Sequence, residues 1–376
     1  MIPVNEPLIG KKELQYITDC VKSGWISSKG SYIKNFEEKF AKFCGVRHGI
    51  STTSGTTALH LALASLGIKK GDEIIMPTFT MVATAYAVLY LGAKPVFIDS
   101  EERTWNMDVS KVEEEIGQKT RVLLPVHIYG HPVDMDPLIK LSKKYSLFVI
   151  EDAAEAHGAK YKGRICGSMG DMNCFSFYAN KVITTGEGGM VVTDDKRLAE
   201  KARLLKDLSH SPKQRFLHTA LAYNYRMTNM QAAIGLAQIE KANILIEKKR
   251  RIASLYNDNL KDIEGLRLPI EEKWAKSVYW MYSILVEDDL GISRDQFKLE
   301  LLKEGIDTRS FFIPMHRQPV IKEMGLVDKK KKYPVSDYIS DHGLYLPTGL
   351  ALKDKDVLSV CETIRKIKKR HASRAR

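Results

Sequence analysis

The sequence predicts an α/β fold with a mostly parallel, helix-covered sheet, followed by a smaller α+β unit. Two observations support this prediction. Short apolar runs alternate with helical segments over about two thirds of the chain, and beyond residue 260 a strong strand signal is followed by a single helix. Because no repeat or low-complexity linker separates the two parts, we expect them to pack closely. We place a large domain at residues 1–240 and a small C-terminal domain at residues 241–376.

The large domain is predicted from six short apolar runs, each of a length typical of a strand. A helix is expected before the first of these strands, since apolar residues recur with helical spacing from Leu59 to Leu66 and stop before Gly67. Alternation of strands with helices favours a parallel sheet. The predicted strands lie at residues 73–76, 94–98, 121–127, 147–151, 174–178 and 190–193.

The C-terminal part begins with a long helical pattern. Residues 229–260 read as one helix that connects the two domains, with a bend expected near Gly235 or Asn243. Residues 277–286 (SVYWMYSILV) predict a strand, and residues 294–305 predict a helix that ends at a glycine. These pieces predict the smaller α+β domain.

Composition limits the class of protein. The chain has 376 residues, of which 44% are hydrophobic and 28% charged, as in soluble globular proteins. No apolar run approaches the roughly 20 residues of a membrane helix. Residues 1–20 carry several charged side chains, so no signal peptide is expected. We therefore predict a cytoplasmic protein without membrane contact.

The net charge of +12 is concentrated in two segments. Four lysines stand at positions 329–332 and seven Lys or Arg residues follow position 364, which leaves the rest of the chain nearly neutral. No aromatic residues are interleaved with the basic tail, so nucleic-acid binding is not expected. The five cysteines show no C-x-x-C spacing, which argues against a disulfide framework or a zinc site. Cys174 is expected to be a buried hydrophobic residue.

Lys181 is the candidate catalytic residue. It follows the strand-like run that ends near Tyr178 and precedes a glycine cluster, a position suited to a lysine that binds a carbonyl compound covalently. Most lysines are solvated charges, so the interpretation depends on neighbouring signals. The run at 147–151 leads into Asp152, and active groups of α/β sheets gather at the carboxyl ends of strands.

A third signal is the start of the helix after Ser54. Gly55 and Thr56 follow, and free N–H groups at such a helix start favour a phosphate, although Ser and Thr are also ordinary N-caps. Pyridoxal 5'-phosphate needs a lysine for its aldehyde, a carboxylate to keep its ring nitrogen protonated and an anion site for its phosphate. Lys181, Asp152 and this helix start meet those three needs.

Long ordered motifs support this cofactor. The segments SGTTALHLAL, GDEIIMPTFT, EDAAEAHGAKYKGRICGSMGD, CFSFYANKVITTGEGGMVV and YNYRMTNMQAAIGLAQIE resemble the DegT/DnrJ/EryC1/StrS family of sugar aminotransferases along nearly the whole chain. The resemblance implies the fold type I aminotransferase architecture, with a seven-stranded large domain. The opening segment and the later DTRSFFIPMH most resemble the GDP-perosamine synthase group of that family.

The resemblance also implies roles for further residues. Glu155 would contact the phenolic oxygen of the cofactor, with a surface glutamate as the alternative. Ser176 would bind the cofactor phosphate, with a buried hydroxyl bonded to the backbone as the alternative. Asn224 would reach the phosphate of the cofactor that is bound to a neighbouring subunit, which implies a homodimer with shared active sites. Arg226 would bind a phosphate or carboxylate, or pair across the interface. Met81 stands where relatives stack an aromatic ring on the cofactor, with core packing as the alternative.

By location in the family, the sugar nucleotide is expected near an N-terminal segment around residues 25–29 and near the later segment TRSFFIPMH. For His316 a structural role is the alternative. The implied reaction transfers the amino group of L-glutamate to the C4 ketone of GDP-4-keto-6-deoxy-D-mannose, with Lys181 as the proton carrier. A UDP- or dTDP-linked 3- or 4-keto sugar, a non-catalytic cofactor-binding regulator and a nucleic-acid binder are the alternatives. Sugar dehydration is disfavoured because relatives that dehydrate carry histidine in place of the lysine. The candidate substrate residues are Trp25, Ser28, Lys29, Arg309 and His316.

Overall fold

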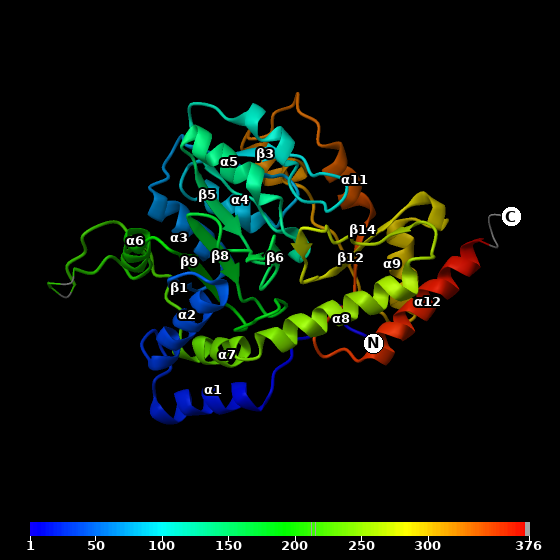
Figure 1. The fold of residues 1–376 in the computed structure, drawn as a ribbon, viewed down its shortest axis with the longest axis horizontal. Coiled ribbons are helices and arrows are strands. Elements are labelled where there is room, and N and C mark those ends of the chain that lie inside the picture. Colours follow the sequence, from blue (N-terminus) through cyan, green and yellow to red (C-terminus); the bar gives the residue numbers. More distant parts are fainter. Residues whose placement is uncertain (212, 215, 373–376) are drawn as a thin grey trace.

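A seven-stranded sheet forms the centre of the computed structural model, which describes residues 1–211, 213–214 and 216–372 (Figure 1). The strand order is β1-β9-β8-β5-β4-β2-β3. Neighbours from β8 to β3 are parallel, whereas β9 runs antiparallel to both β8 and β1. The mostly parallel sheet is thus confirmed. The strands are β1 (His48–Thr52), β2 (Glu73–Pro77), β3 (Lys94–Ile98), β4 (Thr120–Leu123), β5 (Phe148–Asp152), β8 (Met172–Ser176) and β9 (Gly189–Thr193).

Helices cover the sheet because its strands are apolar on both sides. Neighbouring residues Ile74 and Ile75 are both fully buried and belong to two different hydrophobic clusters, as expected when successive side chains point to opposite faces. Leu59 of α3 packs in the first cluster and Leu138 of α5 in the second. The helices of this part are α1 (Lys11–Ser23), α2 (Ser31–Cys44), α3 (Gly55–Leu66), α4 (Val82–Leu89), α5 (Met135–Tyr145) and α6 (Lys196–Lys206).

The predicted helix 229–260 is two helices, α7 (Asn229–Ile239) and α8 (Ala242–Leu260). The break falls at Lys241, whose backbone is not helical; this is near Asn243, one of the two expected positions, and not near Gly235. Gly235 stays inside α7 because it allows close packing: a Cβ there would lie 2.6 Å from the Phe36 ring. Lys241 leaves the helix and donates to the carbonyl of Leu8.

A second sheet, of four antiparallel strands in the order β10-β12-β14-β13, forms the core of the C-terminal part. Helix α8 spans the length between the two sheets and packs against α12 (Figure 1). The strands and helices of the C-terminal part are β10 (Leu266–Arg267), β12 (Tyr282–Val286), α9 (Arg294–Lys303), β13 (Arg309–Ser310), α10 (Pro319–Glu323), α11 (Pro334–His342), β14 (Gly343–Leu346) and α12 (Asp354–Ala372). A small third sheet joins β6 (Lys160–Tyr161), β7 (Arg164–Ile165) and β11 (Ala275–Lys276).

The first residues of the chain contact this second sheet region. Ile2 bridges to Ile306, and Thr348 donates its N–H to the carbonyl of Val4. The N-terminal segment thus contacts the C-terminal part. The domain boundary at residue 240 stays a prediction.

Two predicted strands are too long. The strand expected at residues 121–127 ends at Leu123, as β4. The expected strand 277–286 forms only from Tyr282 onward, as β12. Residues before it leave the extended conformation because they bond to the loop after β4: Val278 donates to the carbonyl of Gly130 and Trp280 to that of Tyr129. Tyr279 adopts a φ of +47°, which breaks the strand.

All five cysteines are buried free thiols, and Cys174 is 1% exposed, as the sequence predicts. In the described residues no helix combines the length and the apolarity that a bilayer crossing requires.

Candidate active site

The candidate active site is a cavity of about 370 Å³ at the carboxyl ends of the central strands. Strands β5 and β8 are parallel neighbours in which Asp152 pairs with Cys174, so the ends of both strands reach the same edge of the sheet. Lys181 lies in the turn that follows β8, and the N-terminus of α3 faces the same space. The cavity thus brings together Ser54, Gly55, Thr56, Asp152, Glu155, Ser176 and Lys181.

The Lys181 amine lies inside the protein. Only 10% of its side chain is exposed, and Nζ lies 3.7 Å from Oε1 of Glu155. Burial lowers the pKa of Lys181, against the opposing effect of the Glu155 and Asp152 carboxylates. A lowered pKa raises the fraction of neutral amine, which is the form that attacks a carbonyl carbon.

Asp152 ends β5 and is 4% exposed. Its Oδ2 accepts a hydrogen bond of 2.8 Å from the Thr84 hydroxyl, and its Oδ1 accepts one of 3.2 Å from the N–H of Ala154. No described cation forms an ion pair with it, and burial raises the pKa of the Asp152 carboxyl. A buried carboxylate of this kind is stabilised when a cationic group enters the cavity beside it.

Glu155 is buried too, at 4% exposure, which excludes the surface glutamate considered above. Its Oε2 accepts a 2.7 Å hydrogen bond from the N–H of Tyr129, whose φ of +54° is a left-handed conformation that a bulky side chain rarely adopts. Burial raises the pKa of Glu155 to about 7, partly offset by the nearby Lys181 ammonium. This carboxyl can therefore hold or release a proton near neutral pH.

The anion end of the cavity combines a helix start with a strand end. Ser54 caps α3 and accepts from the N–H of Thr57, so it is an N-cap that also lines the cavity. Gly55 brings the helix close to β8, because a Cβ at this position would lie 2.7 Å from Cβ of Ser176. Free N–H groups at such a helix start bind phosphate.

These residues fit pyridoxal 5'-phosphate. Lys181 would bind its aldehyde, Asp152 would face its ring nitrogen, and the α3 start with Ser176 would hold its phosphate. The buried Asp152, which lacks a cationic partner in the described chain, is the observation that fits best, since a protonated ring nitrogen supplies that partner.

Three residues implied by resemblance lie at or beyond the cavity edge. Met81 lines the cavity but is 49% exposed, so it does not pack in the core. Asn224 is exposed and lies outside this cavity; its Oδ1 accepts from Nε of Arg226. Arg226 also pairs with Asp207, at 3.0 Å.

The candidate substrate residues are scattered and none lines the cavity. Trp25 and Lys29 are exposed and Ser28 is partly exposed, all between α1 and α2. Arg309 is exposed and pairs with Asp307.

His316 is buried and both of its ring nitrogens are bonded. Nδ1 lies 2.8 Å from the Thr78 hydroxyl and Nε2 lies 3.0 Å from Oδ1 of Asp337. The structure thus favours the structural alternative for this histidine.

Sequence reasoning missed several residues that line the cavity. Thr84 holds Asp152, Tyr178 is exposed at 48%, and Trp280 and Phe312 come from the C-terminal part of the chain. The residues around Trp280 predicted only a strand. A strand pattern does not show which of its side chains will line a cavity formed with another part of the chain.

Comparisons with known proteins agree with this site. The profile of the DegT/DnrJ/EryC1/StrS aminotransferase family matches residues 7–365. The chain is 44% identical to a GDP-perosamine synthase of Escherichia coli O157:H7, over 96% of this chain and 97% of the relative. It is 42% identical to one of Caulobacter vibrioides, over 95% of each.

Among solved structures, the protein Spr1654 of Streptococcus pneumoniae in its PLP-form superposes with a TM-score of 0.91 at 26% identity, covering 98% of this chain and 99% of that one. The fold, the cavity and the family profile point the same way. The chain belongs to the DegT/DnrJ/EryC1/StrS aminotransferase family.

Proposed function

We propose that this chain is a pyridoxal phosphate-dependent nucleotide-sugar aminotransferase that moves the amino group of L-glutamate to the C4 ketone of GDP-4-keto-6-deoxy-D-mannose, giving GDP-perosamine. The observation that supports the reaction class is the single cavity that unites the Lys181 amine, the Asp152 carboxylate and the α3 start. The choice of sugar nucleotide is supported by the similarity to GDP-perosamine synthases.

When bound, pyridoxal phosphate stores the amino group between the two substrates and accepts the electrons that a removed proton leaves behind. The protein supplies the rest. Asp152 keeps the ring nitrogen protonated. Lys181, once freed, takes the proton from the α-carbon of glutamate and later returns a proton on the sugar side, which requires an amine that is neutral before it acts. Burial favours that neutral form.

The assay is mass spectrometry of the products formed from GDP-4-keto-6-deoxymannose and glutamate. A product heavier by the ketone-to-amine exchange is expected, and Lys181→Ala should abolish it together with the visible absorbance of the bound cofactor. A panel of UDP- and dTDP-linked 3- and 4-keto sugars decides the alternative substrates. Strict preference for a non-guanosine nucleotide would remove the GDP-perosamine assignment, and turnover by Lys181→Ala would remove the role of Lys181. Cofactor binding without any reaction with glutamate would point to a regulator.

The active form is proposed to be a homodimer. Asn224 lies outside the cavity of its own chain, on the segment between α6 and α7 that projects from the body (Figure 1). That segment exposes Leu217 and Leu221 at 48% and 93%, and the cavity mouth exposes Met81 and Tyr178 at about half. Apolar surface of this kind is typical of an interface.

A mixing experiment tests the shared site. Lys181→Ala and Asn224→Ala homodimers should each be nearly inactive. After subunit exchange, a mixed dimer contains one site with both native residues, so random pairing should restore about a quarter of the wild-type sites. Absence of any recovery, with exchange verified by mass spectrometry, would contradict the shared site. The cytoplasmic location stays a prediction from sequence.

A further inference from the structure

The Lys181 amine has an aromatic neighbour that the reaction outlined above does not use. Its Nζ lies 3.7 Å from the centroid of the Trp280 ring. Trp280 is 4% exposed and lines the same cavity, although it precedes β12 in the C-terminal part of the chain. A cation this close to the face of an indole is attracted by the negative face of the ring.

Trp280 is fixed at each of its polar groups. Its backbone N–H donates to the carbonyl of Tyr129 at 2.9 Å, and its indole Nε1 donates to the carbonyl of Asn180 at 2.8 Å. Its own carbonyl accepts a 2.8 Å hydrogen bond from the buried amine of Lys249. The ring therefore has one position relative to Lys181, whose neighbour Asn180 it holds.

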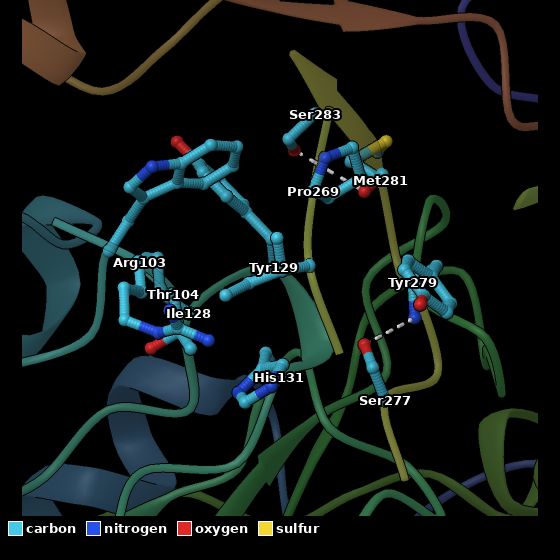
Figure 2. Close-up of a pocket in the computed structure, with 12 residues that line it drawn as sticks. Arg103, Thr104, Ile128, Tyr129, His131, Pro269, Ser277, Tyr279, Met281 and Ser283 are labelled. Carbon is cyan, nitrogen blue, oxygen red and sulfur yellow. Dashed lines mark hydrogen bonds between the residues drawn. The ribbon is translucent and has the colours of Figure 1, made fainter. Parts of the chain in front are cut away.

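The backbone around Trp280 is held in an uncommon conformation that directs this ring to the cavity. Tyr279 has a φ of +47°, and Tyr129, to which Trp280 bonds, has one of +54°. Figure 2 shows that the side chains of Tyr279 and Met281 lie beside a separate small cavity, lined also by Tyr129. Trp280, between those two residues, instead lines the active-site cavity. Strained conformations that surrounding structure maintains gather at functional sites.

The charged groups around the Lys181 amine do not make the ring redundant. Glu155 is the nearest carboxylate, at 3.7 Å, and Asp152 acts from farther away. His157 is buried, and burial lowers its pKa to about 3, so it is neutral near pH 7. Glu155 loses its charge when it is protonated, because burial raises its pKa to about 7. In that state the ring face, 3.7 Å from Nζ, still favours an ammonium.

We propose that Trp280 is a further catalytic residue, whose indole face stabilises the ammonium form of Lys181 each time that the freed amine has taken up the substrate proton. The inference rests on the proposed role of Lys181 but not on the identity of the sugar nucleotide. The ring forms no bond and takes no proton. It offsets part of the cost of placing a positive charge in a buried cavity.

The test measures the pH at which the Lys181 amine becomes reactive in the cofactor-free protein. Lys181 is labelled with limiting 1-fluoro-2,4-dinitrobenzene at a series of pH values, and mass spectrometry of its peptide gives the midpoint of reactivity. Trp280→Leu should lower that midpoint by about 0.4 to 1.5 pH units, since a cation–π contact is worth about 0.5 to 2 kcal/mol and 1.36 kcal/mol equals one pH unit. Trp280→Phe, which keeps a ring but loses the indole N–H, should give a smaller decrease.

Trp274→Leu is the matched control, because Trp274 precedes Trp280 by six residues and packs on Tyr161, away from the cavity. Its midpoint should equal that of the wild type. An unchanged midpoint in Trp280→Leu overturns the proposal, and so does an equal decrease in Trp280→Phe and Trp280→Leu, which would assign the effect to the indole N–H. Circular dichroism checks the fold. If Trp280→Leu does not fold, Trp280→Met replaces it.

A second experiment distinguishes failure of the proposed function from failure of the inference on Trp280. Borohydride reduction of the wild-type protein loaded with pyridoxal phosphate should fix the cofactor to the Lys181 peptide. Fixation at another lysine would overturn the role of Lys181 in the reaction and with it the catalytic proposal for Trp280. Fixation at Lys181 with unchanged midpoints in the Trp280 variants would overturn the inference on Trp280 alone.

Discussion

Replacement of Lys249 by methionine should remove a pH dependence of stability that the wild-type protein carries. Lys249 of α8 is fully buried, and its Nζ donates to two backbone carbonyls, of Trp280 at 2.8 Å and of Thr348 at 2.6 Å. No described carboxylate pairs with it. Burial without a negative partner lowers the pKa of this amine from 10.5 to about 7.

The sign follows from proton binding. Between pH 7 and 10.5 the unfolded chain binds a proton at Lys249 that the folded chain releases, so the free energy of unfolding rises with pH in this window. Below pH 7 both states are protonated and the destabilisation is complete, at about 5 kcal/mol for the fall in pKa. From pH 7 to pH 10 the wild type should therefore gain about 3 to 4 kcal/mol from this one group.

The assay is denaturant unfolding of the wild type and of Lys249→Met at pH 7, 8, 9 and 10. The difference between the two free energies of unfolding should change by about 3 to 4 kcal/mol across the series, with the wild type gaining. The two carbonyls that lose their donor add a constant cost that does not alter this slope. Lys248→Met, at the preceding residue of α8, which is not buried, is the control and should follow the wild type. Parallel pH curves for the wild type and Lys249→Met would refute the reasoning.

Three further predictions concern the cofactor site. Thr84→Val removes the hydroxyl that donates to Asp152 and should weaken pyridoxal phosphate binding by about 10- to 150-fold, since a hydrogen bond to a charged group is worth about 1.5 to 3 kcal/mol; titration of the cofactor-free protein measures it, and Thr84→Ser should bind as the wild type does. Gly55→Ala places a methyl 2.7 Å from Cβ of Ser176 and should release the cofactor on dialysis while circular dichroism stays unchanged; full retention would contradict the close approach. Glu155→Gln should abolish a change of slope near pH 7 in the rate of the glutamate half-reaction, because Glu155 gains its charge as the pH rises through about 7; the same inflection in both proteins would assign it elsewhere.

Much of the large domain could be predicted from the sequence because its signals are local. The strand at residues 94–98 was predicted with the observed bounds, and α3 begins at its Ser54 cap and ends at Gly67, whose φ is +85°. A cap, a glycine and an apolar spacing act within one turn or strand, so they can be read without knowledge of the rest of the chain. Asp152 ends β5 and Lys181 follows β8 in the next turn, which is why both could be predicted as candidates.

Short strands were harder to predict. β1 was missed, and strands of two residues such as β10 and β13 carry no periodic signal. The run at 277–286 has a strong strand pattern, yet its first half bonds to Gly130 and Tyr129 and leaves the extended conformation. Hydrogen bonds from a distant loop decided its shape, and local propensity could not report them.

The sequence by itself identified Lys181 and Asp152 as the candidates for the amine and the carboxylate, since Lys181 follows β8 and Asp152 ends β5. The tertiary structure alone decided that Trp280 covers the Lys181 amine and that Thr84 holds Asp152. The physical reason is that these contacts join residues about 100 and 68 positions apart. Their distances depend on how the C-terminal part packs over the sheet edge and how α4 lies against β5, and no spacing in the chain encodes that packing.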